Sequence, residues 1–117
     1  MSQLAQLHLD EARGITVATV EGEIDLSNAT ELEMAISQAV GNEAVGLALD
    51  LARVDYLDSS GVTLLFNLAR RVARRQQRFV VVVPADAHVA EILSLSGATD
   101  ALALHETLDD AVRGLST

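Results

Sequence analysis

The sequence contains no cysteine, no lysine and no tryptophan, and a single proline among its 117 residues. Without cysteine there is no disulfide framework, no thiol nucleophile and no thiolate metal site. Without lysine, and with its glycines dispersed, the chain has no P-loop of the kind that cradles phosphates in nucleotide hydrolases. Because only 3% of the residues are aromatic, we expect an aliphatic core, which favours helices layered on a sheet.

Positive charge is also scarce, since eight arginines stand against 17 acidic residues and the formal net charge is −9. Such a protein repels nucleic-acid phosphates and anionic lipid surfaces, so we expect no direct binding of nucleic acid. The opening residues lack the pattern of a signal peptide and no apolar run reaches membrane-spanning length, so we expect no membrane insertion. These features together predict a soluble cytoplasmic protein.

Half of the residues are hydrophobic, and they are arranged as one set of strands and helices. The length suits a single domain over residues 1–117 with a core at about 4–113. Alternating apolar residues predict two strands, 4–9 and 15–20, joined by turn residues into an antiparallel hairpin. Further along, strands alternate with helices, which requires crossover connections and mostly parallel strands. The predicted fold is therefore α/β, with a mixed sheet and the order ββαβαβαβα.

Each later element is predicted from apolar spacing and from capping residues. The strand over 45–51 places leucines on one face and Ala48 on the other, as expected when both faces are covered. The helix that follows has apolar residues at the three-and-four spacing of one buried stripe. The remaining signals are Asn28 as the cap of the first helix, Gly41 after its end, a strand over 79–83, Asp86 opening a short helix, a weak strand over 101–104, Thr107 with Asp110 capping the last helix, and a frayed end at 114–117.

The segment Asp58-Ser59-Ser60-Gly61 lies where the strand over 45–51 gives way to the second helix. It places two small hydroxyl residues at the start of a helix, whose free backbone N–H groups favour an anion such as the phosphate of a modified serine. Asp and Ser are also preferred as helix caps, so the same residues fit a purely structural role. Both interpretations are compatible with the segment taken alone.

Asp25 occupies the equivalent place at the other strand-to-helix junction. Loops that follow neighbouring parallel strands reach the same edge of a sheet. Asp25, Asp58 and the two serines would then form one small acidic face lined with hydroxyl groups. The alternative is two independent helix starts with no shared role.

No other pattern predicts catalysis, a metal or a cofactor. His8, His88 and His105 lie far apart and lack metal-ligand spacing, and no nucleophile-elbow signature accompanies a serine. A cluster of arginines over residues 70–78 complements the dipole at the end of the second helix, although it also fits the acidic patch of a partner. We therefore expect no catalytic residues, no metal and no cofactor.

Three segments together resemble the STAS domain of bacterial anti-sigma factor antagonists. They are Gly22-Glu23-Ile24-Asp25-Leu26, the run from Leu49 to Gly61 that contains Asp58-Ser59-Ser60, and Leu93-Ser94-Leu95-Ser96-Gly97. One such motif is weak, but all three in order form a specific signal, and the resemblance covers about residues 15–112. It implies a sheet of four or five strands with helices largely on one side, and it favours a switch over capping alone.

The resemblance implies that Ser60 is phosphorylated by a partner anti-sigma factor with serine kinase activity. It also implies that Asp25, Asp58, Ser59 and Gly61 contribute to the surface that binds this kinase. The unphosphorylated protein would bind the anti-sigma factor and release the sigma factor, phosphorylation would end that binding, and a phosphatase would reset it. The protein would thus be a substrate and a binding module, not an enzyme, and its oligomeric state is left open.

Two other functions are compatible with the same residues. Stand-alone STAS domains also resemble subunits of transporter or stress-signalling assemblies, in which the same surface contacts a different protein. A small-ligand or nucleotide-binding module would instead use the helix start beside Ser60 as an anion site. The hydroxyl at Ser60 favours the phosphorylated type, because a purely structural subunit has no need of one. Against a ligand module, the chain offers little aromatic lining for a pocket.

Overall fold

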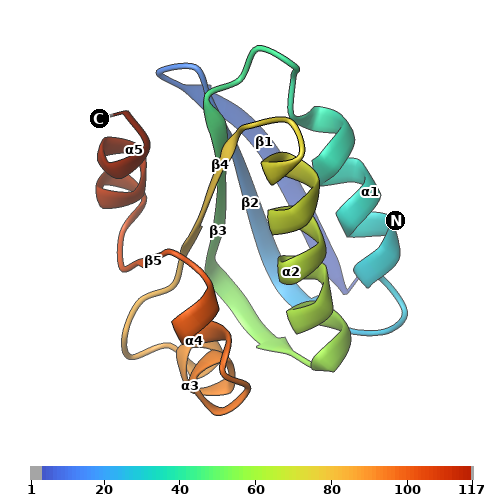
Figure 1. The fold of residues 1–117 in the computed structure, drawn as a ribbon. Coiled ribbons are helices and arrows are strands. Elements are labelled where there is room, and N and C mark those ends of the chain that lie inside the picture. The colour runs from blue at the N-terminus through green and yellow to red at the C-terminus, as the bar shows by residue number, and fades with distance from the viewer. Residues whose placement is uncertain (1–3, 117) are drawn as a thin grey trace.

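The computed structural model describes residues 4–116, which form a five-stranded sheet flanked by helices (Figure 1). The strands are β1 (Ala5–Ala12), β2 (Ile15–Ile24), β3 (Gly46–Leu57), β4 (Arg78–Val82) and β5 (Leu104–His105). They lie in the sheet in the order of the chain, with β3 in the middle. β1 and β2 are antiparallel, whereas β2 to β5 run parallel to one another. The mixed sheet with an opening hairpin, predicted from the sequence, is confirmed.

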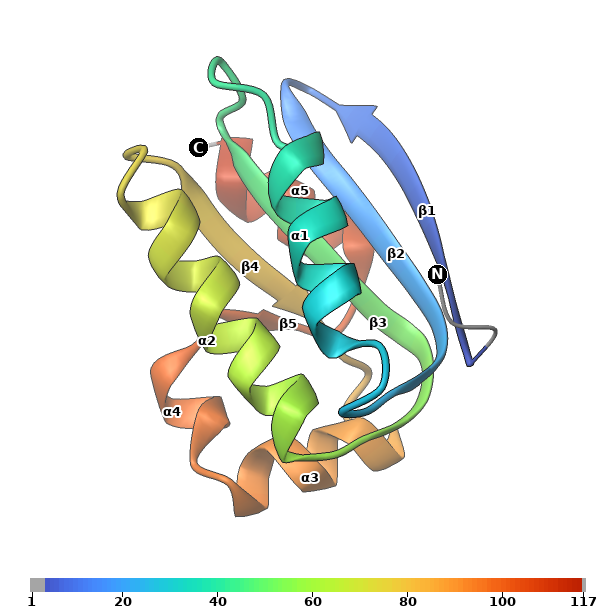
Figure 2. The same ribbon diagram turned by 90° about the vertical axis from the view of Figure 1, so that its right-hand side faces the viewer.

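Five helices pack around this sheet within the described residues. They are α1 (Ala29–Ala39), α2 (Ser59–Ala73), α3 (His88–Leu95), α4 (Ala98–Ala101) and α5 (Leu108–Ser116). α1 and α2 cover one face of the sheet and α5 covers the other (Figure 2). α3 and the very short α4 close the end of the sheet at which α2 begins (Figure 1). The predicted order of elements is observed, with α4 as an additional turn of helix.

The sheet is buried on both faces because helices lie on both. Leu47, Leu49 and Leu51 of β3 are fully buried in the cluster that contains the apolar faces of α1 and α2. Ala48 points the other way, into a smaller cluster that includes Ala111 of α5. Each leucine buried in this way contributes about 2 kcal/mol. The burial of both faces predicted for this strand is confirmed.

The first hairpin is held at a close approach of its two strands. Gly22 of β2 has a φ of +106°, and a Cβ there would lie 2.1 Å from the Leu4 carbonyl oxygen. Glycine alone tolerates both the backbone angle and the contact. With this contact in place, β2 continues to Ile24, beyond its predicted end at residue 20. Asp25 therefore follows directly on the carboxyl end of β2.

β3 is also longer than predicted, because it remains paired with β2 as far as Leu57. Val54 and Leu57 are buried, whereas Asp55 and Tyr56 are exposed. This half-exposed extension lacks the continuous apolar run that marks the first part of the strand. The connection from β3 to α2 is therefore Asp58 alone.

In the last third of the chain, the start of one helix and the extent of one strand differ from the prediction. Asp86 does not cap α3, since the cap position is Ala87 and no side chain bonds to that helix start. The weak strand predicted over 101–104 is wrong in its extent, because Ala101 ends α4 and β5 contains only Leu104–His105. Both regions are short, and tertiary packing outweighs local propensity there.

The final helix begins as predicted and ends later. The Thr107 hydroxyl accepts a hydrogen bond of 3.1 Å from the backbone N–H of Asp110, which confirms this cap. The frayed end predicted at 114–117 is wrong as far as Ser116, because α5 continues to that residue and Leu115 is buried. Thr117 lies outside the described residues. One apolar side chain is enough to anchor this last turn.

Candidate functional site

Two strand-to-helix junctions lie side by side at the carboxyl ends of the neighbouring strands β2 and β3. The parallel register pairs Ile24 with Leu57, the last residues of β2 and β3. The backbone N–H of Asp58 donates a hydrogen bond of 3.2 Å to the Ile24 carbonyl oxygen. Asp25 and Asp58 therefore begin their connections on adjacent strands, which are spaced about 5 Å apart. The predicted meeting of the two junctions is confirmed.

Asp58 caps α2. Its Oδ1 atom accepts hydrogen bonds from the backbone N–H groups of Ser60, at 2.8 Å, and Gly61, at 3.3 Å. The structural role expected of a cap residue is thus present. These N–H groups are among the donors that a phosphate at this helix start would use. A phosphate on Ser60 would therefore meet the carboxylate of Asp58 where the sequence alone suggested free donors.

The hydroxyl of Ser60 is available at this junction. Ser60 is half-buried and lines a surface depression of about 200 Å³ between α1 and α2. Across residues 4–116, no hydrogen-bond partner is found for its hydroxyl group. Ser59 is exposed at the first position of the helix. Both serines can be reached from solvent, and Ser60 faces the depression.

Gly61 allows the start of α2 to lie against the ends of β2 and β3. It is buried, and a Cβ at this position would lie 2.7 Å from the Cβ of Leu57 and 3.4 Å from the Cγ2 of Ile24. Any side chain would push the helix start away from the sheet, and Ser60 with it. Gly61 is thus placed to position its neighbours, and it offers no side chain to a partner.

The other junction is closed by its own side chains. The Asp25 Oδ1 atom accepts hydrogen bonds from the backbone N–H of Ser27, at 2.8 Å, and from its hydroxyl, at 2.5 Å. Asn28, which is 1% exposed, accepts from the N–H of Asp25 at 3.0 Å and donates to the Glu23 carbonyl at 2.9 Å. Asn28 precedes α1 as predicted but makes no side-chain hydrogen bond to that helix. Its amide closes the loop instead.

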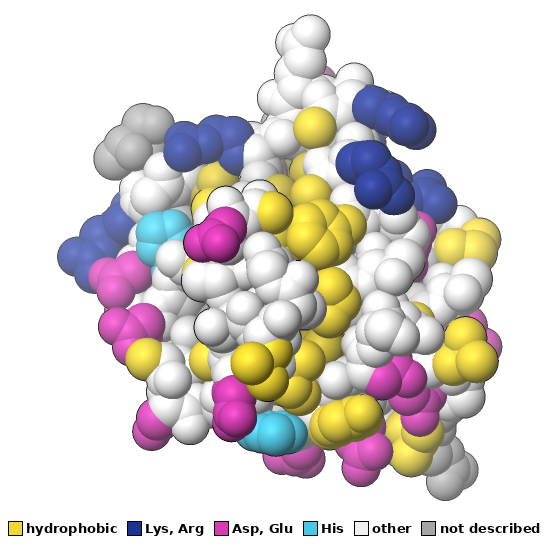
Figure 3. Space-filling model, turned by 60° about the horizontal axis from the view of Figure 1, so that its bottom comes forward, with side chains coloured by type: hydrophobic (Ala, Val, Ile, Leu, Met, Phe, Trp, Pro, Cys, Tyr) yellow, Lys and Arg dark blue, Asp and Glu magenta, His cyan; other side chains and the backbone are white. Residues whose placement is uncertain are grey.

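Exposed apolar side chains surround the junctions, and none of them was predicted as a site residue. Leu26 is 82% exposed and lines the same depression as Ser60. Leu95, at the end of α3, is 82% exposed, and Tyr56, which stacks on His88 at 6.4 Å between ring centroids, is 44% exposed. Figure 3 looks onto this end of the molecule and shows hydrophobic side chains on its surface with acidic ones around them. The sequence did contain one signal for this surface: Leu26 stands between the polar residues Asp25 and Ser27 at a predicted strand-to-helix junction.

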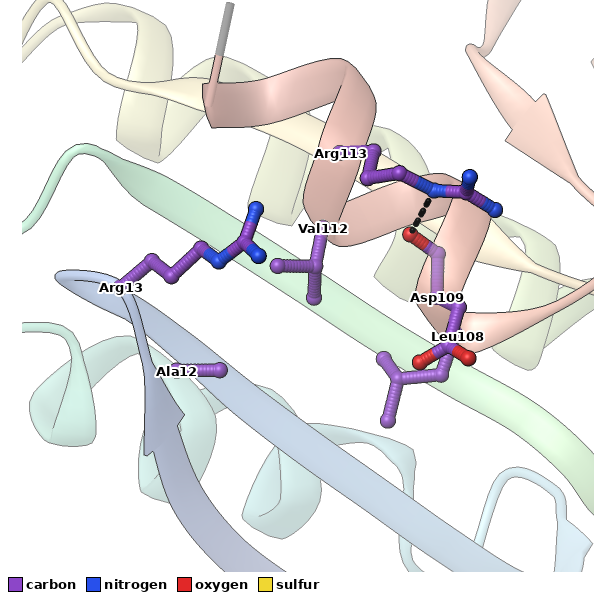
Figure 4. Close-up of a pocket in the computed structure, with 6 residues that line it drawn as sticks. All are labelled: Ala12, Arg13, Leu108, Asp109, Val112 and Arg113. Carbon is purple, nitrogen blue, oxygen red and sulfur yellow. Dashed lines mark hydrogen bonds between the residues drawn. The ribbon is translucent and has the colours of Figure 1, made fainter.

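A larger depression, of about 500 Å³, lies away from these junctions (Figure 4). It is formed between the β1–β2 turn, which carries Arg13, and α5, which carries Leu108, Val112 and Arg113. The Arg113 guanidinium is engaged on its own helix, where it pairs with Asp110 at 2.7 Å. This depression contains none of the predicted site residues and lies on the face of the sheet opposite to α1 and α2.

Residues 4–116 contain no group of three or more His, Asp or Glu side chains that could hold a metal. His8 pairs with Glu21 across the hairpin, while His88 and His105 lie on α3 and β5. Over the same residues, no helix combines the length and the apolar character needed to cross a membrane. What the junction offers chemically is an accessible hydroxyl on Ser60, a residue whose backbone N–H is bound by the Asp58 carboxylate.

Sequence relatives match most of the chain. The family model of the STAS domain matches residues 6–111. RsfB of Mycobacterium tuberculosis, an anti-sigma-F factor antagonist, is 31% identical over 102 residues, which are 87% of this chain and 82% of that protein. The match thus includes both junctions and the helices that follow them.

Solved structures share the fold. The crystal structure of an anti-sigma factor antagonist from Mycobacterium paratuberculosis superimposes with a TM-score of 0.85 at 29% identity, covering 97% of this chain and 95% of that one. Unphosphorylated SpoIIAA gives 0.69 at 20% identity, covering 93% and 99% of the two chains. Phosphorylated SpoIIAA from Bacillus gives 0.68 at 20% identity, covering 94% and 99%. With its three motifs, its sheet order and these relatives, the chain belongs to the STAS domain family.

Proposed function

We propose that the protein is an anti-sigma factor antagonist whose binding is switched off by phosphorylation of Ser60. In its unphosphorylated form it binds an anti-sigma factor with serine kinase activity, and the sigma factor is released. The observation that carries this proposal is the Ser60 hydroxyl, which is accessible and has no hydrogen-bond partner within residues 4–116, on a residue whose backbone N–H is bound by the Asp58 carboxylate. The names of the relatives support the class of partner.

Charge accounts for the switch. Phosphorylation replaces a neutral hydroxyl by a group that carries about −1.5 to −2 charges. Asp58 already occupies the N–H groups of Ser60 and Gly61, so the new charge lies beside a fixed negative charge and finds few free donors. A partner that covers the junction removes solvent, and the repulsion between the two groups increases. A loss of about 2.7 kcal/mol weakens binding about a hundredfold.

Apolar contacts supply affinity to the unmodified form. Large apolar side chains are exposed at the end of the sheet where the two junctions lie: Leu26 in the β2–α1 loop, Tyr56 near the end of β3, and Leu95 at the end of α3 (Figure 1). Interfaces bury such side chains at their centre and surround them with polar groups. Asp25 and Ser59 border this apolar surface and provide polar contacts at its edge. The phosphate would then appear at the margin of a surface that must become dry when the partner binds.

The switch requires no change of fold. The Asp58 backbone is tied to β2 through the Ile24 carbonyl, and its side chain holds the helix start. SpoIIAA, which shares the fold, matches this chain nearly equally in its unphosphorylated and phosphorylated forms, with TM-scores of 0.69 and 0.68. In that protein, one fold carries both states. We expect the same of Ser60, whose modification adds charge to a preformed surface.

In this scheme the protein is a substrate and not an enzyme. The kinase brings the nucleotide, the metal ion and the catalytic base for phosphoryl transfer, and a phosphatase restores the hydroxyl by hydrolysis. A role as a small-ligand module is less well supported, because the described residues that line the depression at Ser60 include no aromatic side chain, whereas ligand pockets are lined predominantly by hydrophobic and aromatic side chains.

Incubation with the cognate anti-sigma factor and Mg-ATP, followed by peptide mass spectrometry, tests the proposal. We expect phosphate on Ser60 in the wild type and in the Ser59→Ala variant, and none in Ser60→Ala. The Ser60→Ala variant should still bind the anti-sigma factor, which shows that its surface is intact. Phosphate on other residues alone would overturn the assignment. Copurification from cells with a transporter ATPase in place of a kinase would overturn the function.

A further inference from the structure

A polar stripe runs along α2 from Ser60 to the end of the helix. Ser60, Thr63, Asn67, Arg70 and Arg74 follow one another at alternating steps of three and four residues. This spacing places them on one side of an α-helix. At 1.5 Å per residue the stripe is about 21 Å long. The residue proposed for phosphorylation therefore shares a helix face with two arginines at the opposite end.

A groove between α1 and α2 follows this stripe. The depression beside Ser60 continues into a second one, of about 300 Å³, because both have Glu33 and Asn67 in their walls. One glutamate faces three arginines in the second depression, so this end of the groove is positive in a protein whose net charge is −9. The residues that line it are Glu33, Asn67, Arg70, Arg71 and Arg74.

Two arginines of this region are explained by the packing of the helices. Arg75 donates hydrogen bonds to the carbonyl oxygens of Val40, at 2.8 Å, and Ser37, at 3.2 Å, at the end of α1. Arg71 pairs with Glu33 of α1 at 3.0 Å, and the Glu33 side chain is only 13% exposed. Both arginines tie α1 to α2, so a change at either would weaken the packing of these helices.

Arg70 and Arg74 have no comparable structural role. The Arg70 guanidinium donates to the amide oxygen of Asn67 on its own helix, and the Asn67 amide in turn donates to Glu33 of α1 at 2.9 Å, so Arg70 contacts α1 only indirectly. Arg74 is exposed, and its guanidinium has no partner among the residues that the structure describes. Cations are favourable near the end of any helix, but the helix dipole explains neither the groove nor its alignment with Ser60. Arg70 is bound to a neutral amide and Arg74 has no partner within residues 4–116, so no carboxylate compensates either charge.

We infer that the positive end of this groove receives an acidic segment of the same partner that covers Ser60; the inference rests on the proposed function. An extended segment spans the stripe with about six or seven residues. Charge complementarity selects the segment, since Arg70 and Arg74 offer paired donors that suit carboxylates. Nucleic acid and a second copy of this chain also carry negative charge, but the net charge of −9 repels both.

Affinity measurements with the purified cognate anti-sigma factor test this surface. The matched variants are Arg74→Glu and Arg13→Glu, because Arg13, exposed in the β1–β2 turn, also lacks a partner within residues 4–116. Both substitutions change the net charge equally. At low salt we expect the double variant Arg70→Glu/Arg74→Glu to bind about tenfold more weakly or worse, Arg74→Glu about threefold, and Arg13→Glu within about twofold of wild type. At 0.5 M salt these differences should shrink.

Circular dichroism and thermal melting confirm the fold of each variant, and Arg70→Gln/Arg74→Gln serves if the glutamate variants fail to fold. Equal affinity of the wild type and the double variant would overturn this inference but leave the proposed function standing. An equal loss of affinity in Arg74→Glu and Arg13→Glu would also overturn it, because the loss would then reflect net charge and not the groove. Self-association, or binding of a short DNA duplex, that depends on Arg74 would assign the groove to another occupant. No binding by the wild type would overturn the proposed function and the inference together.

Discussion

The two junctions at the edge of the sheet use similar residue types for opposite purposes. At the β2–α1 junction the Ser27 hydroxyl is bound by Asp25, and the buried Asn28 ties the loop to the end of β2. At the β3–α2 junction Asp58 binds backbone N–H groups, and the Ser60 hydroxyl has no partner within residues 4–116. The acidic residue engages the serine hydroxyl in one case and leaves it available in the other.

This difference follows from the length of the two connections. The β2–α1 loop spans residues 25–28, whereas Asp58 alone connects β3 to α2. A longer loop must satisfy the hydrogen bonds of its own backbone, and its polar side chains are used for that purpose. A connection of one residue passes directly into the helix, so its cap satisfies the helix start and nothing else. A modifiable serine is therefore compatible with the short junction, and the long one supplies a rigid wall beside it.

The largest expected effect is on the affinity for the anti-sigma factor, and it distinguishes Ser60 from Ser27. We expect Ser60→Asp to weaken binding of the anti-sigma factor at least tenfold, and phosphorylated Ser60 about a hundredfold, because the added charge lies beside Asp58. Ser60→Ala and Ser27→Ala should bind within about twofold of wild type, since neither adds charge. Isothermal titration calorimetry measures all four. A Ser60→Asp variant that binds as tightly as wild type would contradict charge repulsion as the cause.

A smaller effect is expected from opening the long junction. Asn28→Ala leaves the Glu23 carbonyl and the Asp25 N–H without their partner, and each unsatisfied group costs about 1–3 kcal/mol when buried. We expect the free energy of unfolding to fall by about 2 kcal/mol in urea denaturation. Ser27→Ala, at an exposed hydrogen bond, should change it by less than about 0.5 kcal/mol. Equal effects of the two variants would mean that burial does not distinguish these bonds.

Substitution of Asp58 separates its cap from its charge. Asp58→Ala should lower the free energy of unfolding by about 1 kcal/mol, whereas Asp58→Asn should nearly preserve it, because asparagine caps as well as aspartate. Asp58→Asn also removes the charge next to Ser60. In that variant we expect phosphorylation of Ser60 to weaken partner binding severalfold less than in wild type. An unchanged ratio of the two affinities would show that the repelling charge belongs to the partner.

The architecture was predictable because alternation and helical spacing report burial directly. The leucines of β3 and Ala48 lie on the faces that their sequence pattern indicates, and both are covered. Thr107 caps α5 as its residue type predicts. Where local signals conflict with tertiary contacts, prediction failed: β3 continues to Leu57 because β2 pairs with it, and Leu115 holds the last turn of α5 in place.

The site was only partly predictable for a related reason. The side-by-side placement of Asp25 and Asp58 follows from parallel strands, and a cap role for Asp58 follows from its residue type. The use of each side chain does not follow from the sequence, because Asn28 has the same preferred position whether it caps α1 or closes the loop. The exposure of Leu26 could not be predicted either. Hydrophobicity alone predicts that a leucine is buried, whereas the geometry of the β2–α1 turn leaves this one exposed.

A third carboxylate, Glu21, sharpens the contrast between solvated and covered charge. The Arg53 guanidinium, at 3.2 Å, and then His8, at 2.7 Å, hold the pKa of Glu21 below its ordinary value of 4.5. Because the pKa is lowered in the folded state, this pairing stabilises the fold above about pH 4.5, and the contribution is lost as the pH falls through the lowered value. The cluster is accessible to solvent, so screening keeps its effect small.

We expect Arg53→Gln to raise the pKa of Glu21 toward 4.5, because it removes the first cause of the shift. Carboxyl chemical shifts followed by NMR during an acid titration measure this change. The same variant should lose less stability than wild type between pH 4.5 and lower pH, and should bind the partner normally at neutral pH. A pKa of Glu21 that does not move would assign the shift to His8. A loss of partner binding would show that the partner also covers this exposed cluster. Glu21 would then lose its solvent on binding, as Asp58 does, and the contrast between the two carboxylates would fail.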